Sequence, residues 1–227
     1  MRIATWNCCR GRFEAKVPLL DSLRPDIAVI QEVARPADPA RALWYGSNPK
    51  QGLAVLARNG YTVDAVSTHA GVQRHIVPIQ VTGPHHFFLL AVWSQRDPQH
   101  PYVQGVIRAV ELYRDLIQAQ PAVVVGDFNS NAIWDRKRNS ARDHSALVSM
   151  LADLGLVSAY HSFHREEQGA ETCATHYFRW KEDAGYHVDH CFVPTAWADK
   201  LTSVSVGRYA DWAGSSDHRP VLVEMAI

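Results

Sequence analysis

The sequence lacks any hydrophobic segment long enough to cross a membrane. Its longest apolar run extends from Phe87 to Trp93, far short of the roughly 20 residues that a membrane-spanning helix needs. At the start of the chain, Met1 to Trp6 lead directly into strand-like sequence without an apolar leader or a cleavage site, so no signal peptide is predicted. We therefore expect no membrane association and a cytoplasmic location.

Cysteine is scarce as well. The four cysteines form neither a CxxC pair nor a dense disulfide framework, which predicts reduced thiols in a cytoplasmic protein. The 12 histidines are more numerous, but they show neither an HExxH motif nor the Cys/His spacing of a zinc site. These absences argue against a disulfide-stabilised scaffold and against a zinc protein.

Net charge is missing too. Lys plus Arg and Asp plus Glu each number 23, so the formal net charge is zero with neutral histidines. A neutral chain argues against a protein that holds nucleic acid through bulk positive charge. A local basic patch stays compatible with this composition.

The apolar residues that are present form many short runs. No repeat, low-complexity tract or linker interrupts them, so we predict a single catalytic domain over residues 1–227. The runs indicate strands at residues 3–6, 27–31, 53–56, 61–66, 76–81, 87–93, 122–125, 187–193, 201–206 and 221–225. Helical spacing predicts helices near residues 14–23, 101–118 and 147–154, with Gly155 ending the last. This pattern predicts an α/β fold of two packed sheets flanked by helices.

Polar residues suited to phosphoryl chemistry lie at or near the ends of these predicted strands. They are Asn7, Glu32, Asp127, Asn129, Asp189, Asp217 and His218. Strand ends in a packed α/β domain converge on one cleft, where carboxylates bind a hard divalent cation and an Asp–His pair holds an imidazole in one state. Taken singly, each has a simpler explanation, because Asn at a strand end and Gly-Asp-Phe-Asn are also common in tight turns.

The order of the motifs resembles that of the endonuclease/exonuclease/phosphatase superfamily. The matching segments are Thr5-Trp6-Asn7, Gln31-Glu32, Gly52 to Arg58, Gly126-Asp127-Phe128-Asn129, His187 to His190 and Ser216 to Pro220. Together they extend over nearly the whole chain. The resemblance implies a four-layer α-β-β-α sandwich and a metal-dependent phosphoesterase.

The resemblance also implies the metal ligands. Glu32 is similar to the principal ligand, Asn7 to the amide beside the metal or a phosphate oxygen, and Asp217 to the metal-proximal carboxylate of its motif. The implied cofactor is Mg²⁺, for which Mn²⁺ substitutes.

Four further residues resemble the catalytic groups. Asp127 is similar to the carboxylate that orients or deprotonates the attacking water, and Asn129 to the donor for the phosphate and that carboxylate. His218 is similar to the imidazole that contacts the scissile phosphate, and Asp189 to its carboxylate partner. Which group removes the proton from the water is left open.

Two positions depart from the family pattern. Many members end the strand at Trp93 with a histidine or tyrosine that aids the leaving group, whereas Trp cannot act as an acid near neutral pH. The alternatives in this sequence are the metal alone, or Arg96, His100 or Tyr102. At Cys9, where some nucleases carry a carboxylate, we expect a packed thiol, because magnesium prefers oxygen ligands.

The substrate is less well defined by the sequence. A basic loop follows the Asp127 motif, with Trp134 and the four cations Arg136, Lys137, Arg138 and Arg142. Such a loop suits a nucleic-acid backbone with a stacked base, but it equally suits a solvated surface. The aromatic segment from Thr175 to Trp180 is similarly open: its rings suit base stacking, but core positions are favoured for two or three of them.

Three functions are therefore compared. We favour a nuclease or phosphodiesterase that acts on DNA or RNA. The alternative is a phosphatase or phosphodiesterase that acts on a small-molecule or lipid phosphate ester. The sequence shows no hairpin with exposed aromatic residues, which argues against a lipid substrate. A catalytically inactive binding module is disfavoured because all the motif residues are present. No feature points to an obligate protein partner.

Overall fold

The computed structural model describes residues 1–135 and 143–227, and its apolar runs form two mixed sheets. The strand order of the first sheet is β13 (Leu201–Val206), β14 (Val221–Met225), β1 (Arg2–Asn7), β2 (Ile27–Val33), β4 (Gln51–Ala57) and β3 (Leu43–Asn48). That of the second is β5 (Thr62–Ala65), β6 (Ile76–Thr82), β7 (Phe87–Trp93), β8 (Ala122–Asp127), β12 (Asp189–Pro194) and β9 (Leu156–Ser158). The pairs β1–β2 and β7–β8 are parallel, and the other neighbouring pairs are antiparallel.

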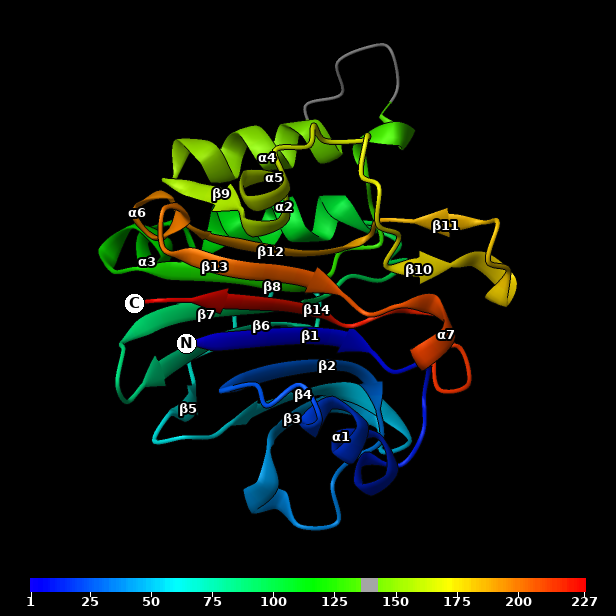
Figure 1. Cartoon of the computed structure of the whole chain (residues 1–227). Helices are drawn as coiled ribbons and strands as arrows, with labels where there is room; N and C mark the ends of the chain where they lie inside the picture. The colour runs from blue at the N-terminus through cyan, green and yellow to red at the C-terminus, as the bar shows by residue number, and fades with distance from the viewer. Residues whose placement is uncertain (136–142) are drawn as a thin grey trace.

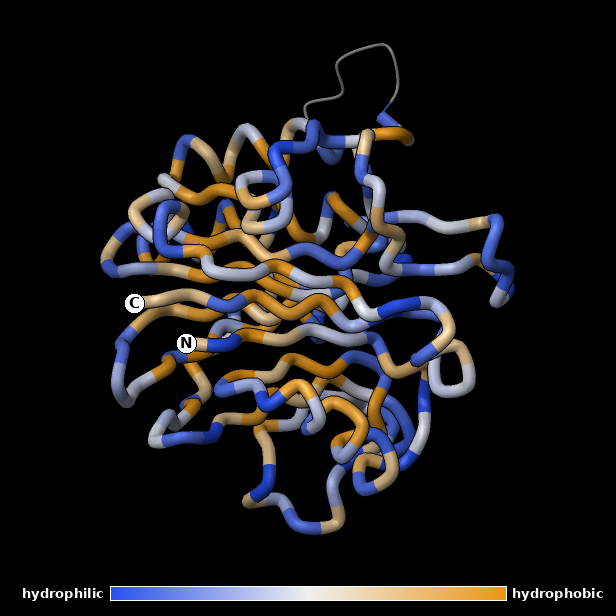
Figure 2. The backbone as a smooth tube through the Cα atoms, in the orientation of Figure 1, coloured by the Kyte–Doolittle hydropathy of each residue, from blue (hydrophilic) through white to orange (hydrophobic). Residues whose placement is uncertain are grey.

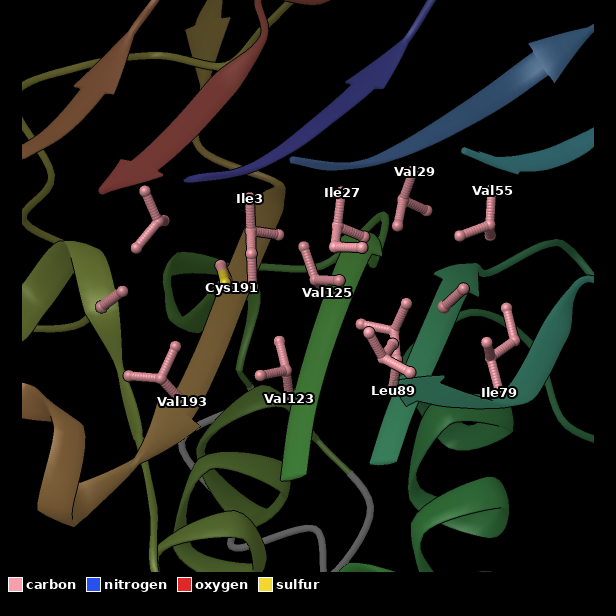
Figure 3. Close-up of a cluster of buried hydrophobic side chains, with 14 of the residues drawn as sticks. Ile3, Ile27, Val29, Val55, Ile79, Leu89, Val123, Val125, Cys191 and Val193 are labelled. Atoms are coloured by element: carbon pink, nitrogen blue, oxygen red, sulfur yellow. The ribbon is translucent and has the colours of Figure 1, made fainter. Parts of the chain in front are cut away.

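The two sheets pack face to face over an apolar core. Figure 3 shows aliphatic side chains of both sheets meeting between them, among them Ile3 and Ile27 from the first sheet and Val123 and Val125 from the second. In β8 the alternate residue Val124 points the other way, into the helix-covered core. Because β8 is buried on both faces, its sequence is a continuous hydrophobic run instead of an alternating one.

Helices cover the outer faces of both sheets. The helix α1 (Phe13–Asp21) buries Phe13, Val17 and Leu20 against the first sheet. The second sheet is covered by α2 (Val103–Leu112), α3 (Arg114–Ala119) and α4 (His144–Asp153). Figure 1 shows the resulting order of helix, sheet, sheet and helices, and Figure 2 shows the hydrophobic residues concentrated in the central layers. The predicted four-layer α-β-β-α sandwich is confirmed.

The remaining elements are short. They are α5 (Ala159–His164), α6 (Thr195–Ala198), α7 (Tyr209–Trp212), the 3₁₀ turns η1 (Pro39–Arg41), η2 (Ala132–Trp134) and η3 (Phe178–Trp180), and the paired strands β10 (His176–Tyr177) and β11 (Gly185–Tyr186). β1 ends and β12 begins at the edge of the sandwich beside β10 and β11, while the chain termini lie at the opposite edge (Figure 1). None of the helices in the two described ranges combines the length and hydrophobicity needed to cross a bilayer.

Two local predictions from the sequence were wrong. The helix expected over residues 101–118 is divided at Tyr113, whose backbone leaves the helical region at φ −103° and ψ 15°. Its side chain is buried against Phe88 and its hydroxyl accepts a hydrogen bond from the N–H of His69, so tertiary contacts hold this residue. By contrast, the helix α4 ends as predicted before Gly155, which adopts φ +77°.

The hairpin β10–β11 is the second difference. It projects from the sandwich (Figure 1) and carries Phe178 and Trp180, which are 50% and 44% exposed. The sequence suggested no hairpin with exposed aromatic residues and favoured core positions for the aromatics of this segment. Strands of two residues each are too short to leave a readable alternation, which explains why the pattern missed them.

Candidate active site

Strand register places Asp127 and Asp189 side by side. Asp127 ends β8, Asp189 begins β12, and the two residues are direct partners in this antiparallel pair. Directly opposite residues of such a pair point to the same face with neighbouring Cβ atoms. Gly126 permits the geometry, because a Cβ at this position (φ +150°) would lie 1.8 Å from the carbonyl oxygen of Val92 on β7. Both carboxylates are fully buried.

Asn7 connects these carboxylates to the other sheet. It is the last residue of β1, and its Nδ2 donates to Asp127 Oδ2 at 3.0 Å and to Glu32 Oε1 at 3.2 Å. Below it, Gln31 donates to Thr5 Oγ1 in the first sheet and to the carbonyl of Val92 in the second. These hydrogen bonds fix the two sheets relative to each other directly beneath the site.

Glu32 and Asn129 both adopt left-handed backbone conformations, with φ values of 64° and 48°. Such conformations are uncommon for residues with a side chain and cluster at functional sites. Glu32 lies in an irregularity of β2, where the register against β4 shifts between Ile30 and Val33. The Nε2 of Gln51 on β4 donates to Glu32 Oε2 at 3.0 Å and holds the carboxylate in place.

Asn129 closes a tight turn over Asp127. Its backbone N–H donates to Asp127 Oδ1 and its Nδ2 to Asp127 Oδ2, both at 2.9 Å. The same Nδ2 lies 3.1 Å from the carbonyl oxygen of Ser94, which follows β7. The turn interpretation of Gly-Asp-Phe-Asn therefore holds, and this turn positions the carboxylate of Asp127.

His218 faces Asp189 from the loop before β14. Its Nδ1 lies 2.9 Å from Asp189 Oδ2, so the N–H on that nitrogen donates to the carboxylate and Nε2 is the nitrogen available to a substrate. The loop is attached to β1: Ser216 Oγ donates to the carbonyl of Asn7 and accepts from the N–H of His218. The indole of Trp6 donates to the carbonyl of His218 at 3.3 Å.

These contacts shift two pKa values. Burial and the nearby charge of Asp189 raise the pKa of Asp127 to about 7, against the opposing effects of His218 and Asn7. Burial alone would lower the pKa of His218, but the charges of Asp189 and Asp127 and the hydrogen bond to Asp189 outweigh it and raise the value to about 9. Near neutral pH the imidazole therefore carries a proton while Asp127 titrates, which suits a general base.

The site has the donor atoms for a divalent cation. Carboxylate oxygens of Asp127 and Asp189 and a ring nitrogen of His218 all lie within 4.8 Å of one another, the only such group of three acidic, histidine or cysteine residues among the described residues. Because the imidazole is protonated near neutral pH, the two carboxylates, and not His218, are the groups of this cluster that can face a cation. Asp189 Oδ1 is buried without a hydrogen-bond partner in the described part of the chain, as expected of an oxygen whose partner is a bound group. Glu32 lies outside this group of three and reaches it through Asn7.

Asp217 lies beside Cys9 and His176. The distance from Asp217 Oδ2 to His176 Nε2 is 3.8 Å. Burial raises the pKa of Cys9 to about 11, and the charge of Asp217 and the hydrogen bond with Asp217 contribute to this shift. The thiol therefore stays protonated, as expected for a packed cysteine beside an oxygen-ligand site.

The sequence missed several residues of this region. The ring of His176 lies 4.5 Å from that of His218, and Gln51 holds Glu32. Arg219 is fully buried between the rings of Tyr177 and Tyr209, 4.7 and 4.6 Å from their centroids, and donates to the carbonyls of Ser216 and His218. Arg219 lies inside the Ser216 to Pro220 motif and His176 inside the aromatic segment 175–180, but the sequence assigned neither of them a role at the site.

Other predicted residues have different outcomes. Arg136, Lys137, Arg138 and Arg142 lie outside the described residues. Trp93 is buried, packs against the tilted ring of His75 with ring centroids 4.6 Å apart, and is the register partner of Asp127. Of the three residues considered in its place as acids, Tyr102 lines a cavity together with Asn129.

Comparison with known proteins identifies the family. The model of the endonuclease/exonuclease/phosphatase family matches residues 4–218. The chain belongs to this family. The family predicted from the motifs is thereby confirmed, and with it the prediction of a phosphoester hydrolase. A search of curated protein sequences gave no significant match.

Solved structures share the fold. The 3′ phosphatase NExo from Neisseria, bound to a product DNA hairpin, is 22% identical, with a TM-score of 0.74 over 100% of both chains. An AP endonuclease from Archaeoglobus fulgidus is 16% identical, with a TM-score of 0.70 over 100% of both chains. The endonuclease domain of TRAS1, a telomere-specific non-LTR retrotransposon, is 16% identical, with a TM-score of 0.68 over 99% of this chain and 97% of that domain.

Proposed function

We propose that the protein is a magnesium-dependent nuclease that hydrolyses phosphodiester bonds in DNA or RNA, with residues 1–227 as one catalytic domain. The observation that carries the proposal is the buried cluster of Asp127, Asp189 and His218, joined through Asn7 to Glu32. The similar folds of a phosphatase bound to a DNA hairpin and of an AP endonuclease support a nucleic-acid substrate. Free thiols at all four cysteines support the proposed cytoplasmic location.

The metal would be held by oxygen ligands. Glu32, Asn7 and Asp217 are the proposed ligands, and their carboxylate and amide oxygens suit Mg²⁺, with Mn²⁺ as a substitute. Bound there, the cation would neutralise phosphate charge and stabilise the departing oxygen.

The four catalytic residues divide the remaining work. Asp127, with its pKa raised to about 7, orients the attacking water and accepts its proton. Asn129 holds that carboxylate and presents its amide to the phosphate. His218 places its protonated Nε2 toward a phosphate oxygen, and Asp189 keeps the imidazole charged and in one orientation.

A panel assay tests the proposal. Single- and double-stranded DNA, abasic-site DNA, RNA and a small phosphodiester are incubated with Mg²⁺, Mn²⁺ or excess chelator. We expect metal-dependent cleavage of at least one nucleic acid, and Glu32→Gln should reduce metal affinity and turnover together. Gln51→Glu is unsuitable as a control, because the side chain of residue 51 contacts Glu32. Asp64→Asn is the matched control, because it makes the same carboxylate-to-amide change at an exposed residue away from the site. Full activity in chelator, or a wild-type-like Glu32→Gln enzyme, contradicts the mechanism.

The substrate grip is tested separately. We propose that Arg136, Lys137, Arg138 and Arg142 hold the nucleic-acid backbone. Neutralising all four should weaken binding and flatten its salt dependence by about one unit of slope per lost phosphate contact. Cleavage of a small phosphodiester should change little, and an unchanged salt slope would show that the loop is only solvated.

One observation favours the alternative substrate class. The exposed Phe178 and Trp180 on the projecting hairpin β10–β11 are flanked by Arg179 and Lys181, and aromatic residues with cations also suit an anionic lipid surface. A phosphatase or phosphodiesterase for a lipid or small phosphate ester therefore stays the second candidate. It predicts activity on such esters in the same panel with none on nucleic acid.

A further inference from the structure

A cavity opens next to the active site on the side of Asn129. Its volume is about 560 Å³, within the range of small-ligand sites. Among its lining residues are Tyr102 before α2, Trp134 on η2, and Asn129, whose amide donates to Asp127. Asn129 therefore connects this cavity directly to the carboxylate of Asp127.

Two exposed aromatic rings line the cavity. Tyr102 is 41% exposed and Trp134 is 50% exposed, an unusual exposure for such large apolar groups in one hollow. Burying either ring against a flat partner would remove much of this apolar area from water.

The protein holds the ring of Trp134 and the backbone of Tyr102 in place. Trp134 packs against Tyr186 with ring centroids 5.3 Å apart. Its turn η2 is fixed by the buried Asn131, which donates to Glu171 and to the carbonyl of His187 and accepts from the N–H of Ile133. Tyr102 has a backbone φ of 51°, and its N–H donates to the carbonyl of Gln95. Prefixed rings lose little entropy on binding.

The described lining of the cavity suits a neutral group better than a phosphate. Its described lining contains no lysine or arginine but two carboxylates, Asp135 and Asp143. Both accept hydrogen bonds at the start of α4: Asp135 from the N–H groups of His144 and Ser145, and Asp143 from that of Ala146. Two carboxylates and no cation among the described lining residues make a poor site for a phosphate, whereas a nucleobase is neutral, flat and aromatic.

We propose that this cavity is a nucleobase subsite, in which Trp134 and Tyr102 stack on the base of a nucleotide flanking the scissile phosphate. The proposal rests on the proposed nuclease function and refines its substrate class. A base that enters the cavity is no longer stacked on its neighbouring bases or paired with the opposite strand. The enzyme should therefore prefer single-stranded or frayed nucleic acid over paired duplex. Stacking reads the face of a base, which every base has, so little sequence preference is expected.

Dinucleoside monophosphates test the subsite, because each contains a single scissile bond. One substrate carries both bases, and two others carry an abasic tetrahydrofuran on the 5′ or the 3′ side. Trp134→Ala and Tyr102→Ala should each lower kcat/KM on the two-base substrate by about 5- to 150-fold. On the substrate that lacks the stacked base, Trp134→Ala should behave like wild type. Tyr102→Phe, which keeps the ring and removes the hydroxyl, separates stacking by Tyr102 from a role of its hydroxyl at the leaving group.

Two further variants separate stacking from structural damage. Ile133 lies on the same turn as Trp134 and is also 50% exposed, but it does not line the cavity. Ile133→Ala should therefore leave kcat/KM on every substrate unchanged. Trp134→Phe keeps a ring and should recover most of the activity. Equal losses by Trp134→Ala on base-containing and abasic substrates, or no loss at all, overturn the subsite.

A binding experiment keeps this proposal distinct from the nuclease function. In chelator, where no cleavage occurs, a single strand containing 2-aminopurine should lose fluorescence on binding wild type and not on binding Trp134→Ala. If the wild-type protein cleaves no nucleic acid with any of the metals, the nuclease proposal fails. The fluorescence quenching then shows by itself whether the cavity binds a base. Absence of quenching by wild type overturns the subsite even in an active nuclease.

Discussion

Two buried clusters with histidines lie on opposite sides of β12 and have opposite electrostatics. The catalytic cluster consists of Asp127, Asp189 and His218. The histidine cluster consists of His144, His161, His187 and His190, with ring centroids 4.8 Å apart for His144–His190, 5.2 Å for His187–His190 and 6.0 Å for His161–His187. Asp189 and His190 are neighbours in sequence, and strand alternation sends their side chains to opposite faces.

The partners of the imidazoles explain the difference. His218 faces two buried carboxylates, and their charges raise its pKa to about 9 despite burial. For His190, burial and the neighbouring His144 and His187 lower the pKa well below its ordinary value, although its hydrogen bond to the carbonyl of Ser130 opposes the shift. At His190, burial among other imidazoles keeps the ring neutral and structural, whereas the two carboxylates around His218 keep its ring charged and able to act on a substrate.

The largest expected effect separates the clusters by activity. Asp127→Asn, Asp189→Asn and His218→Ala should each lower turnover by about 100- to 10,000-fold, the usual contribution of a positioned acid or base, while the fold survives. Because groups that act as a unit give non-additive losses, Asp189→Asn/His218→Ala should be little worse than His218→Ala alone. Turnover and melting temperature are measured on the same preparations.

His190→Gln is the matched control for that experiment. It changes an equally buried imidazole on the next residue of the strand, and its folded fraction should retain wild-type turnover. A large fall in melting temperature for the catalytic-cluster variants, with activity lost only in proportion to unfolding, would instead make them a structural network.

A smaller effect separates the clusters by stability. His190→Ala leaves the carbonyl of Ser130 without its donor and opens a cavity beside Phe128 and His144. We expect a loss of about 2 kcal/mol in the free energy of unfolding. Urea unfolding measures it, and a change within experimental error would show that the histidine cluster contributes no stability.

The smallest effect is a difference in pH dependence, measured in chelator. The folded pKa values of His144, His187 and His190 are lowered, chiefly by burial. Their contribution to stability is therefore complete above the unfolded value of about 6.5 and is lost as the pH falls below it. His190→Gln should flatten this acid branch.

The catalytic cluster has the opposite sign. The pKa of His218 is raised to about 9, so its contribution is complete below about pH 6.5 and is lost as the pH rises toward 9. Asp127, raised to about 7, likewise loses its contribution as the pH rises through that value. Asp127→Asn should flatten this alkaline branch in urea unfolding between pH 5 and 9, and parallel curves for Asp127→Asn and His190→Gln would refute the contrast.

Much of the site was predictable because its motifs are local. Gly-Asp-Phe-Asn is a turn whose backbone and amide hold its own carboxylate, and Ser-Asp-His is a loop whose serine holds its own histidine. Gln51 and His176 were missed for the same reason. Each reaches the site from a different strand, and nothing in its own sequence neighbourhood reports the contact.

The sequence by itself determined the layers of the fold, the end of α4 at Gly155 and the family, because hydrophobic periodicity, a glycine with positive φ and short motifs are properties of neighbouring residues. Only the tertiary structure decided that Asp189 faces Asp127 while His190 faces other histidines, that Tyr113 divides a helix, and that Tyr102 and Trp134 share a cavity. These features depend on which strands pair, in which register, and on loops that meet across long sequence separations. Such contacts are set by packing of the whole chain, so no local pattern encodes them.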